Sequence, residues 1–217
     1  MNPADAADET PEREIARLLE DITAYAQRFK KSRERLLDVQ HISHQTGIAR
    51  DRVHALLRGA RVEREPDEPK ARETFRRGLV VQRLQFLRQT RLKQVARRNG
   101  TVEEQYSLRN IEEVTKISYQ HVSKILNGES GASADHLGRL EQFFGVEPGF
   151  CLKTEDVALV GHLRQMVDVD LPKLATQALL QGGRVALRNP GGEIDHLRDI
   201  LPVLDQLLTQ QQDGNRH

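Results

Sequence analysis

The sequence has few aromatic residues and almost no cysteine. Of its 217 residues 4% are aromatic, none is tryptophan, and Cys151 is the single cysteine. One cysteine excludes an internal disulfide framework and a zinc site built from thiolates, and it suits a reducing compartment. With 37% hydrophobic and 30% charged residues, the composition favours two or three small helical modules over one large domain.

Long apolar runs and catalytic constellations are lacking as well. No stretch approaches the roughly 18 apolar residues of a membrane span, and the acidic N-terminal sequence MNPADAADETPERE differs from a signal peptide. His41, His44 and His54 lack a convincing three-ligand arrangement for a metal site, and the glycine pairs of QGGRVALRNPGGE lack the strand and the lysine of a phosphate-binding loop. We therefore expect a cytoplasmic protein that is no enzyme and uses no metal, cofactor, membrane or evident small-molecule ligand.

The net charge of +1 conceals a strongly basic segment. Between Arg28 and Gly100 there are 20 Lys and Arg residues against 8 Asp and Glu residues, whereas acidic residues are in excess elsewhere. Clustered basic side chains bind nucleic acid because they neutralise phosphates and release condensed counterions. The alternative is a solvated surface on which these charges form salt bridges.

Helical spacing of apolar residues extends over most of the chain and predicts an all-α fold. We expect a first helix over residues 11–32, a long helix from about 71 to 98, a loop or short turn from 99 to 106, and three helices after residue 153, the last over 193–212. A wide leucine stripe on that last helix favours a dimer contact over packing within the chain. The predicted domains are an N-terminal helix-turn-helix unit (1–64), a charged linker (65–74), a second helix-turn-helix domain (75–151), a C-terminal helical dimerisation domain (152–212) and a disordered tail (213–217).

An internal repeat links the first two domains. A shift of 69 residues, without gaps, superposes VQHISHQTGIARDRVHALLRG on LRNIEEVTKISYQHVSKILNG. The matching positions are apolar or small, such as Ile48 with Ile117 and Gly59 with Gly128, and the residues between them differ. This pattern indicates a duplicated scaffold that presents two different surfaces.

Each copy has the spacing of a helix-turn-helix motif. In the second copy Ile111 lies on one helix, Ile117 in the turn, and Val122, Ile125 and Leu126 on the next helix, which Ser118 caps. The segment SLRNIEEVTKISYQHVSKILNGESGASADHLGRLEQFFGV resembles the phage-repressor-like (Cro/C1, XRE) helix-turn-helix family. With the preceding helix from about Gly78, the resemblance covers roughly residues 78–150. The sequence LEQFFGVEPGFCLKTEDV and the helical tail resemble EspR-type actinobacterial regulators, which implies dimerisation through the C-terminal helices.

The resemblance implies that the first turn of the second helix enters the major groove of DNA. Gln120 has the chemistry to pair with adenine, and Lys124 that to reach guanine or a phosphate. In the first copy Arg50 and Arg52 suit guanine or phosphate, although that copy lacks the apolar helix that follows the second. The candidate DNA-binding residues are Ser118, Tyr119, Gln120, His121, Ser123, Lys124, Asn127, Arg50, Arg52, His54 and Arg58.

The sequence thus predicts a nucleoid-associated transcriptional regulator that binds double-stranded DNA. We expect a homodimeric repressor with an inverted-repeat operator and two helix-turn-helix units per chain. The alternatives are a partition or nucleoid-architectural protein that bridges DNA, and a protein-interaction adaptor of the antitoxin or anti-sigma type.

Overall fold

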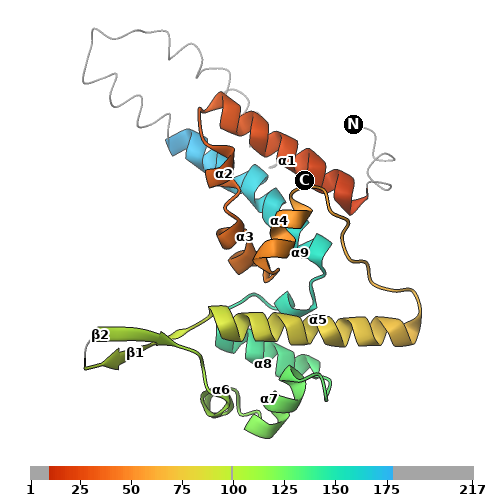
Figure 1. Ribbon diagram of the computed structural model, residues 1–217, viewed down its shortest axis with the longest axis vertical. Helices are drawn as coiled ribbons and strands as arrows, with labels where there is room; N and C mark the ends of the chain where they lie inside the picture. The colour runs from red at the N-terminus through yellow and green to blue at the C-terminus, as the bar shows by residue number, and fades with distance from the viewer. Residues whose placement is uncertain (1–9, 99, 178–217) are drawn as a thin grey trace, which may run out of the picture. The chain divides into compact units, whose positions relative to one another are not determined.

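The computed structural model describes residues 10–98 and 100–177, and helices predominate in it (Figure 1). The expected mainly α-helical fold is confirmed. One two-stranded hairpin interrupts the helices. Residues up to 166 form one compact unit, in which two lobes can be distinguished by the contacts of their helices.

The first lobe contains α1 (Pro11–Arg28), α2 (Arg33–Leu36), α3 (Val39–Thr46), α4 (Arg50–Leu56) and α9 (Glu155–Gln165). Thr10 caps α1 by accepting a hydrogen bond from the Arg13 N–H at 3.4 Å, and a proline follows at the first helical position, where a missing N–H costs nothing. Helix α9 packs against α1 and α3. The fully buried side chains of this lobe include Ile22, Ile42, Val53, Leu159 and Leu163.

The position of α9 corrects the predicted domain boundaries. Residues from 152 onward were expected to start a separate C-terminal domain, yet α9 completes the first lobe about a hundred residues after α4. This helix is the apolar element that the first copy of the repeat lacks in its own sequence. The first lobe is therefore discontinuous in sequence, and the second lobe is inserted into it.

The second lobe is formed by α5 (Pro69–Thr90), α6 (Leu108–Thr115), α7 (Tyr119–Leu126), α8 (Ala134–Phe144) and the 3₁₀ turn η2 (Phe150–Leu152). Leu84, Leu87, Ile111, Val122 and Leu140 belong to its buried core. Helix α6 packs against α7 and α8, and α5 packs against α7 and η2. Buried residues of α5 begin at Leu79, so its first turns lie outside this core.

The segment between α5 and α6 also differs from expectation. The long helix was predicted to continue to residue 98, but it ends at Thr90, and Lys93–Arg97 (β1) pairs antiparallel with Gly100–Glu104 (β2). Valine at 95 and 102 favours a strand, and the Asn-Gly pair at 99–100 is a common hairpin signal. The predicted loop is thus half of a β-hairpin.

Beyond α9 the chain continues as a π-helical turn, η3 (Met166–Asp170), and as helix over residues 171–177. The helix expected over 193–212, on which the dimerisation prediction depends, and the tail lie outside the described residues. Among the helices that are described, none combines the length and apolar character needed to cross a bilayer.

Candidate nucleic-acid interface

The two copies of the repeat have matching helix boundaries. Shifting α3 (Val39–Thr46) by 69 residues gives the bounds of α6 (Leu108–Thr115), and α4 and α7 begin at equivalent residues. Thr46 Oγ1 donates to the Ile42 carbonyl at 2.7 Å, and Thr115 Oγ1 donates to the Ile111 carbonyl at the same distance. These shared hydrogen bonds show that the sequence repeat is also a repeat of local structure.

The turns between the helices match as well, although their residues differ. Gly47 and Lys116 occupy equivalent positions, and both adopt the left-handed conformation, with φ of 69° and 59°. A left-handed glycine, Gly59 or Gly128, follows shortly after each second helix. The two helix pairs thus share their local backbone geometry, whatever each copy binds.

Helix α7 presents a polar, solvent-exposed side. Tyr119 is 44% exposed, and Gln120, Lys124 and Asn127 are exposed too. Val122, Ile125 and Leu126 on the opposite side are buried in the core of the second lobe. Core packing therefore holds the helix while the donors and acceptors of one side stay available.

Other predicted residues of α7 have structural partners. Ser118 caps the helix by accepting from the His121 N–H at 3.3 Å. The His121 ring faces α8, where its Nε2 lies 3.2 Å from Nδ1 of His136. Asn127 donates to Glu129 Oε1 at 3.3 Å, and Ser123 is half-buried. Ser118 and His121 thus make contacts within the lobe, whereas Gln120 and Lys124 extend into solvent.

Helix α4 distributes its predicted residues over two sides. Arg50, His54 and Arg58 are exposed. Arg52 lies on the other side, where its Nε and Nη2 donate to the Glu155 carboxylate of α9 at 2.8 and 2.6 Å. This ion pair raises the pKa of Arg52 and joins α4 to the helix that completes the lobe.

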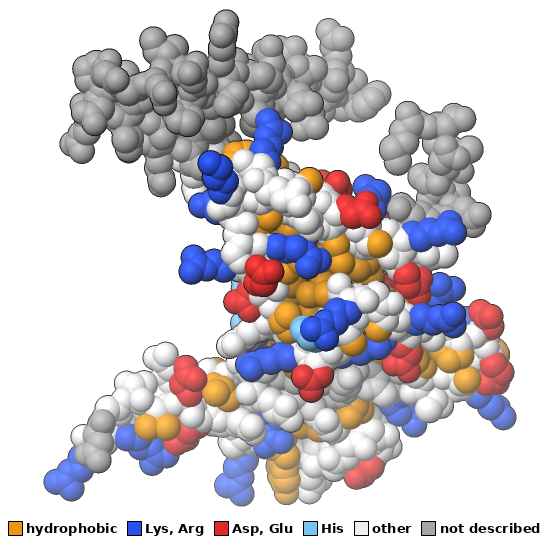
Figure 2. Space-filling model, turned by 45° about the horizontal axis from the view of Figure 1, so that its top comes forward, with side chains coloured by type: hydrophobic (Ala, Val, Ile, Leu, Met, Phe, Trp, Pro, Cys, Tyr) orange, Lys and Arg blue, Asp and Glu red, His pale blue; other side chains and the backbone are white. Residues whose placement is uncertain are grey.

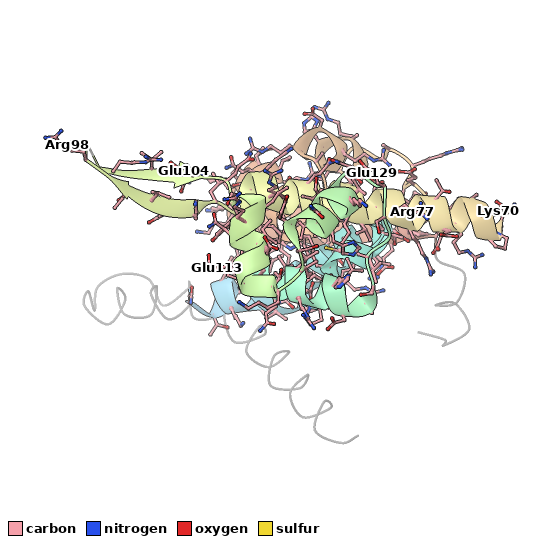
Figure 3. The ribbon with its side chains drawn as sticks, turned by 90° about the horizontal axis from the view of Figure 1, so that it is seen from below. Lys70, Arg77, Arg98, Glu104, Glu113 and Glu129 are labelled. Carbon is pink, nitrogen blue, oxygen red and sulfur yellow. The ribbon has the colours of Figure 1, made fainter. Side chains whose placement is uncertain are left out.

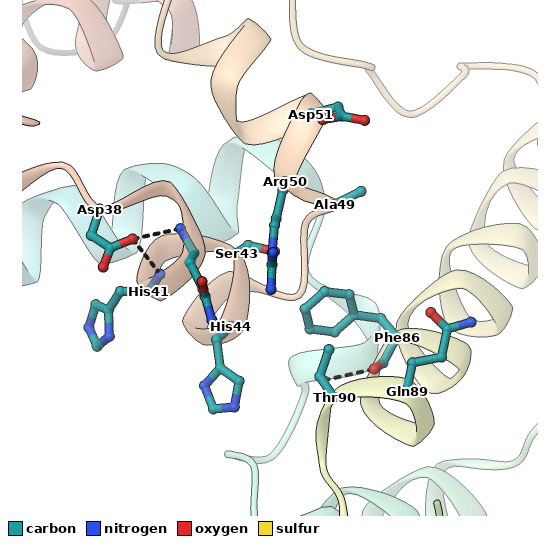
Figure 4. A pocket seen from close by; sticks show the side chains of 11 residues that line it. Asp38, His41, Ser43, His44, Ala49, Arg50, Asp51, Phe86, Gln89 and Thr90 are labelled. Atoms are coloured by element: carbon teal, nitrogen blue, oxygen red, sulfur yellow. Dashed lines mark hydrogen bonds between the residues drawn. The ribbon is translucent and has the colours of Figure 1, made fainter.

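The first turn of α4 adjoins the second lobe. A cavity of about 780 Å³ is lined by Arg50 of α4, by His44 of α3, and by Phe86 and Gln89 of α5 (Figure 4). Arg91, just after α5, donates from Nη2 to the His44 carbonyl at 3.2 Å, and its Nη1 lies 2.9 Å from the His44 Nδ1. Burial and the nearby Arg91 charge lower the pKa of His44.

A buried arginine joins the two lobes. Arg83 of α5 is 1% exposed, and it donates to the Thr46 carbonyl at 2.6 Å and the Lys153 carbonyl at 3.1 Å. Its Nε has no hydrogen-bond partner among the described residues, and burial lowers the pKa of the guanidinium to about 10. The Phe150 ring lies beside it, with the guanidinium carbon 5.9 Å from the ring centroid. The turn of the first repeat is thereby fixed against the second lobe.

Gly47 is essential to this junction for a steric reason. A Cβ atom at Gly47 would lie 2.6 Å from Phe150 Cζ and 2.9 Å from Arg83 Nη1. The backbone on either side of Phe150 is held by Glu141, a 3% exposed residue whose carboxylate accepts the N–H groups of Gly149 and Cys151, each at 2.8 Å. Arg83, as part of the basic segment, was expected to face phosphate, and its burial corrects that expectation. Glu141 was not identified, because the sequence alone does not distinguish a buried charged residue from an exposed one.

Many arginines of the basic segment form ion pairs within the chain. Arg64 pairs with Glu12, Arg76 with Glu65, and Arg97 with Glu104. On the face shown in Figure 2, basic and acidic side chains are interspersed. The segment is therefore less of a continuous positive surface than its charge count indicates.

Comparison with known families identifies the second lobe. A helix-turn-helix family model matches residues 102–150, from β2 through α8 to the start of η2. The second lobe contains a phage-repressor-like helix-turn-helix domain. No curated protein and no solved structure gives a significant match to the chain.

The matched helix-turn-helix domain supports DNA binding of the transcription-regulator type. The match begins after α5, although α5 packs on α7 as part of the same lobe. It does not extend to the first repeat, whose relation to the domain rests on the internal repeat and the matching local geometry.

Proposed function

We propose that the protein is a dimeric repressor that recognises an inverted-repeat operator through helix α7 of each chain. The supporting observation is the exposed polar side of α7 on a helix-turn-helix framework. Gln120 suits a bidentate contact with adenine, and Lys124 suits guanine or a phosphate. Tyr119 at the exposed start of the helix supplies an aromatic surface and a hydroxyl that suits a contact with the DNA backbone.

We assign base recognition to α7 rather than to α4. A recognition helix enters the major groove, which is roughly 12 Å wide, with its first turn against the base edges. The first turn of α4 shares a cavity with α5, and Arg52 is held by Glu155. Arg50, His54 and Arg58, which remain exposed, are then suited to phosphate contacts at most.

The test compares wild-type protein with the Gln120→Ala/Lys124→Ala double variant on duplexes selected by the protein from a random-sequence pool. We expect the preference for selected over bulk DNA to fall at least about tenfold, since a good bidentate base contact contributes about 1–3 kcal/mol of discrimination. Gln142→Ala, which changes an exposed glutamine of α8, is the control and should bind as wild type. Unchanged preference in the double variant would refute recognition by α7.

Dimerisation is proposed through the leucine-rich sequence of residues 193–212. A truncation after Gln177 keeps the helices that complete both lobes and removes this segment. We expect the full chain to sediment as a dimer and the truncated chain as a monomer. A dimeric truncated chain would place the interface elsewhere.

A second candidate is a DNA-bridging architectural protein, which the repeated helix pair specifically favours because one chain then carries two DNA-facing surfaces. Equal, salt-dependent binding to all duplexes would support this function. No DNA binding at low salt would instead support a protein-interaction adaptor.

A further inference from the structure

The β-hairpin projects from the domain that carries α7. Its strands pair with each other from Lys93–Glu104 to Arg97–Gly100, and no third strand joins them in the described part of the chain. Val102 is 48% exposed, and most of the other hairpin residues are exposed as well. Because an isolated two-stranded hairpin is marginally stable in water, a binding partner is expected to contribute to its order.

The base of the hairpin is anchored to the helix that precedes α7. Lys93 Nζ donates to Asn110 Oδ1 at 3.0 Å, and the same oxygen accepts the Ser107 N–H in the capping box of α6. Arg88 of α5 donates to the carbonyl of Tyr106, whose ring centroid lies 4.8 Å from that of Phe143. These contacts couple the base of the hairpin to α6.

The charges of the hairpin are sorted along its length. Glu104 near the base is neutralised by Arg97, which lowers the pKa of the glutamate. Arg98 lies at the outer end of the hairpin (Figure 3) and is exposed. The tip is thus its most positive part, which matches a phosphate backbone.

The length of the hairpin gives its reach along DNA. Five residues per strand at about 3.3 Å each extend roughly 16 Å. Half a turn of B-form DNA is about 17 Å. A hairpin anchored beside α6 is therefore long enough to reach backbone that lies about half a turn from the bases contacted by α7.

We propose that β1–β2 is a DNA-contacting arm that places Arg98 against the sugar–phosphate backbone flanking the α7 site. This proposal rests on the proposed DNA recognition by α7 and extends it to a second, sequence-independent contact. The arm lengthens the bound site by about half a helical turn in each half of a dimer.

The experiment measures the salt dependence of binding and the hydroxyl-radical footprint for wild type and Arg98→Ala on the selected duplex. Removing one phosphate contact should lower the magnitude of the slope of log K against log salt by about 1. Protection should be lost at flanking sugars and retained at the centre, with an unchanged sequence preference. Arg35→Ala, which removes an exposed arginine of α2, is the matched control and should leave slope and footprint unchanged.

The opposite charge change sharpens the test. Glu103→Gln removes an exposed negative charge from β2 without altering the Arg97–Glu104 pair, and it should tighten binding a few-fold at low salt. If Arg98→Ala kept the wild-type slope and footprint, the proposed contact of the hairpin with DNA would be overturned, while recognition by α7 would stand. Loss of the dimer in Arg98→Ala by sedimentation would likewise overturn it, because the hairpin would then contact a second copy.

Discussion

The two repeats have the same backbone and different surroundings. In the second repeat the turn residue Lys116 is exposed, and α7 contacts α8, the helix that follows it in sequence, through the His121 and His136 rings. In the first repeat Gly47 is buried against Phe150 and Arg83, and α4 is tied to α9, which lies about a hundred residues away. One scaffold thus has a turn open to solvent in one copy and a turn used as a joint in the other.

The comparison also separates two reasons for glycine at a left-handed position. Lys116 shows that the conformation alone does not require glycine, although it costs a residue with a Cβ about 1–2 kcal/mol. Gly47 is required in addition because atoms of the second lobe occupy the space of a Cβ. The difference between the two turns can be tested by substitution.

The largest effect is expected for Gly47→Ala. The new Cβ meets Phe150 and Arg83 at distances below 3.0 Å, so the joint must open or the turn must move. We expect a loss of about 3–4 kcal/mol in the free energy of unfolding, the scale of severe overpacking with backbone strain. Urea denaturation followed by circular dichroism measures it, and a change below about 1 kcal/mol would contradict the buried joint. Gly138→Ala on the exposed side of α8, where a Cβ meets nothing within 4 Å, is the control.

A smaller effect is expected from the ion pair between α4 and α9. A double-mutant cycle with Arg52→Ala and Glu155→Ala should give a coupling free energy of about 1 kcal/mol. The guanidinium donates two hydrogen bonds to the carboxylate, but the Arg52 side chain is still 33% exposed. The equivalent cycle in the second repeat, with His121→Ala and His136→Ala, should give a smaller coupling, since neither residue is a carboxylate. Equal couplings would show that Glu155 has no special role in completing the first lobe.

A pH effect distinguishes the two copies further. His44 packs against Arg91, whereas the equivalent residue in the second repeat, Glu113, is exposed. Because the folded state lowers the pKa of His44 below the ordinary histidine value of 6.5, the unfolded state binds its proton more readily. The associated stability is present above pH 6.5 and is lost as the pH falls below it.

The check is the unfolding midpoint of wild type and His44→Gln across pH 5 to 8. Their difference should depend on pH below about 6.5. Parallel curves over the whole range would mean that burial of His44 has no energetic consequence.

The smallest expected change is a gain. Lys116→Gly removes the Cβ from a left-handed residue whose side chain is exposed, so the free energy of unfolding should rise by up to about 1 kcal/mol. Thermal denaturation measures this as a small upward shift of Tm. A loss of stability would show that the lysine side chain contributes more than its backbone conformation costs.

Sequence patterns were informative where structure is local. The spacing of Ile42, Thr46 and Ile48 recurs 69 residues later. This repeat identified both helix pairs, because each pair is determined by residues close together in the sequence. The hairpin was missed although Asn99-Gly100 indicated it, since the arginines before it also fit a helix.

Partnerships between distant segments were not predictable in the same way. The apolar spacing of α9 shows that the helix has a buried face, but not that this face covers α1 and α3. Arginine is a residue type that commonly contacts DNA, so the sequence made Arg52 a candidate. Its ion pair with Glu155 depends on the packing of the distant helix α9, which the sequence does not show. The exposure of Gln120 and Lys124 on α7 was predictable because it follows from the local helix pair, and their contact with DNA stays a prediction.

The return of α9 to the first lobe has a consequence for the order of synthesis. Helices α1 to α4 emerge from the ribosome long before α9, so the first lobe must wait with an incomplete core while the inserted domain is being made. The second lobe has its helices close together along the chain, and short-range contacts form fastest. We therefore expect the second lobe to fold first and the first lobe to fold only when α9 has been synthesised. This reverses the usual order along a nascent chain.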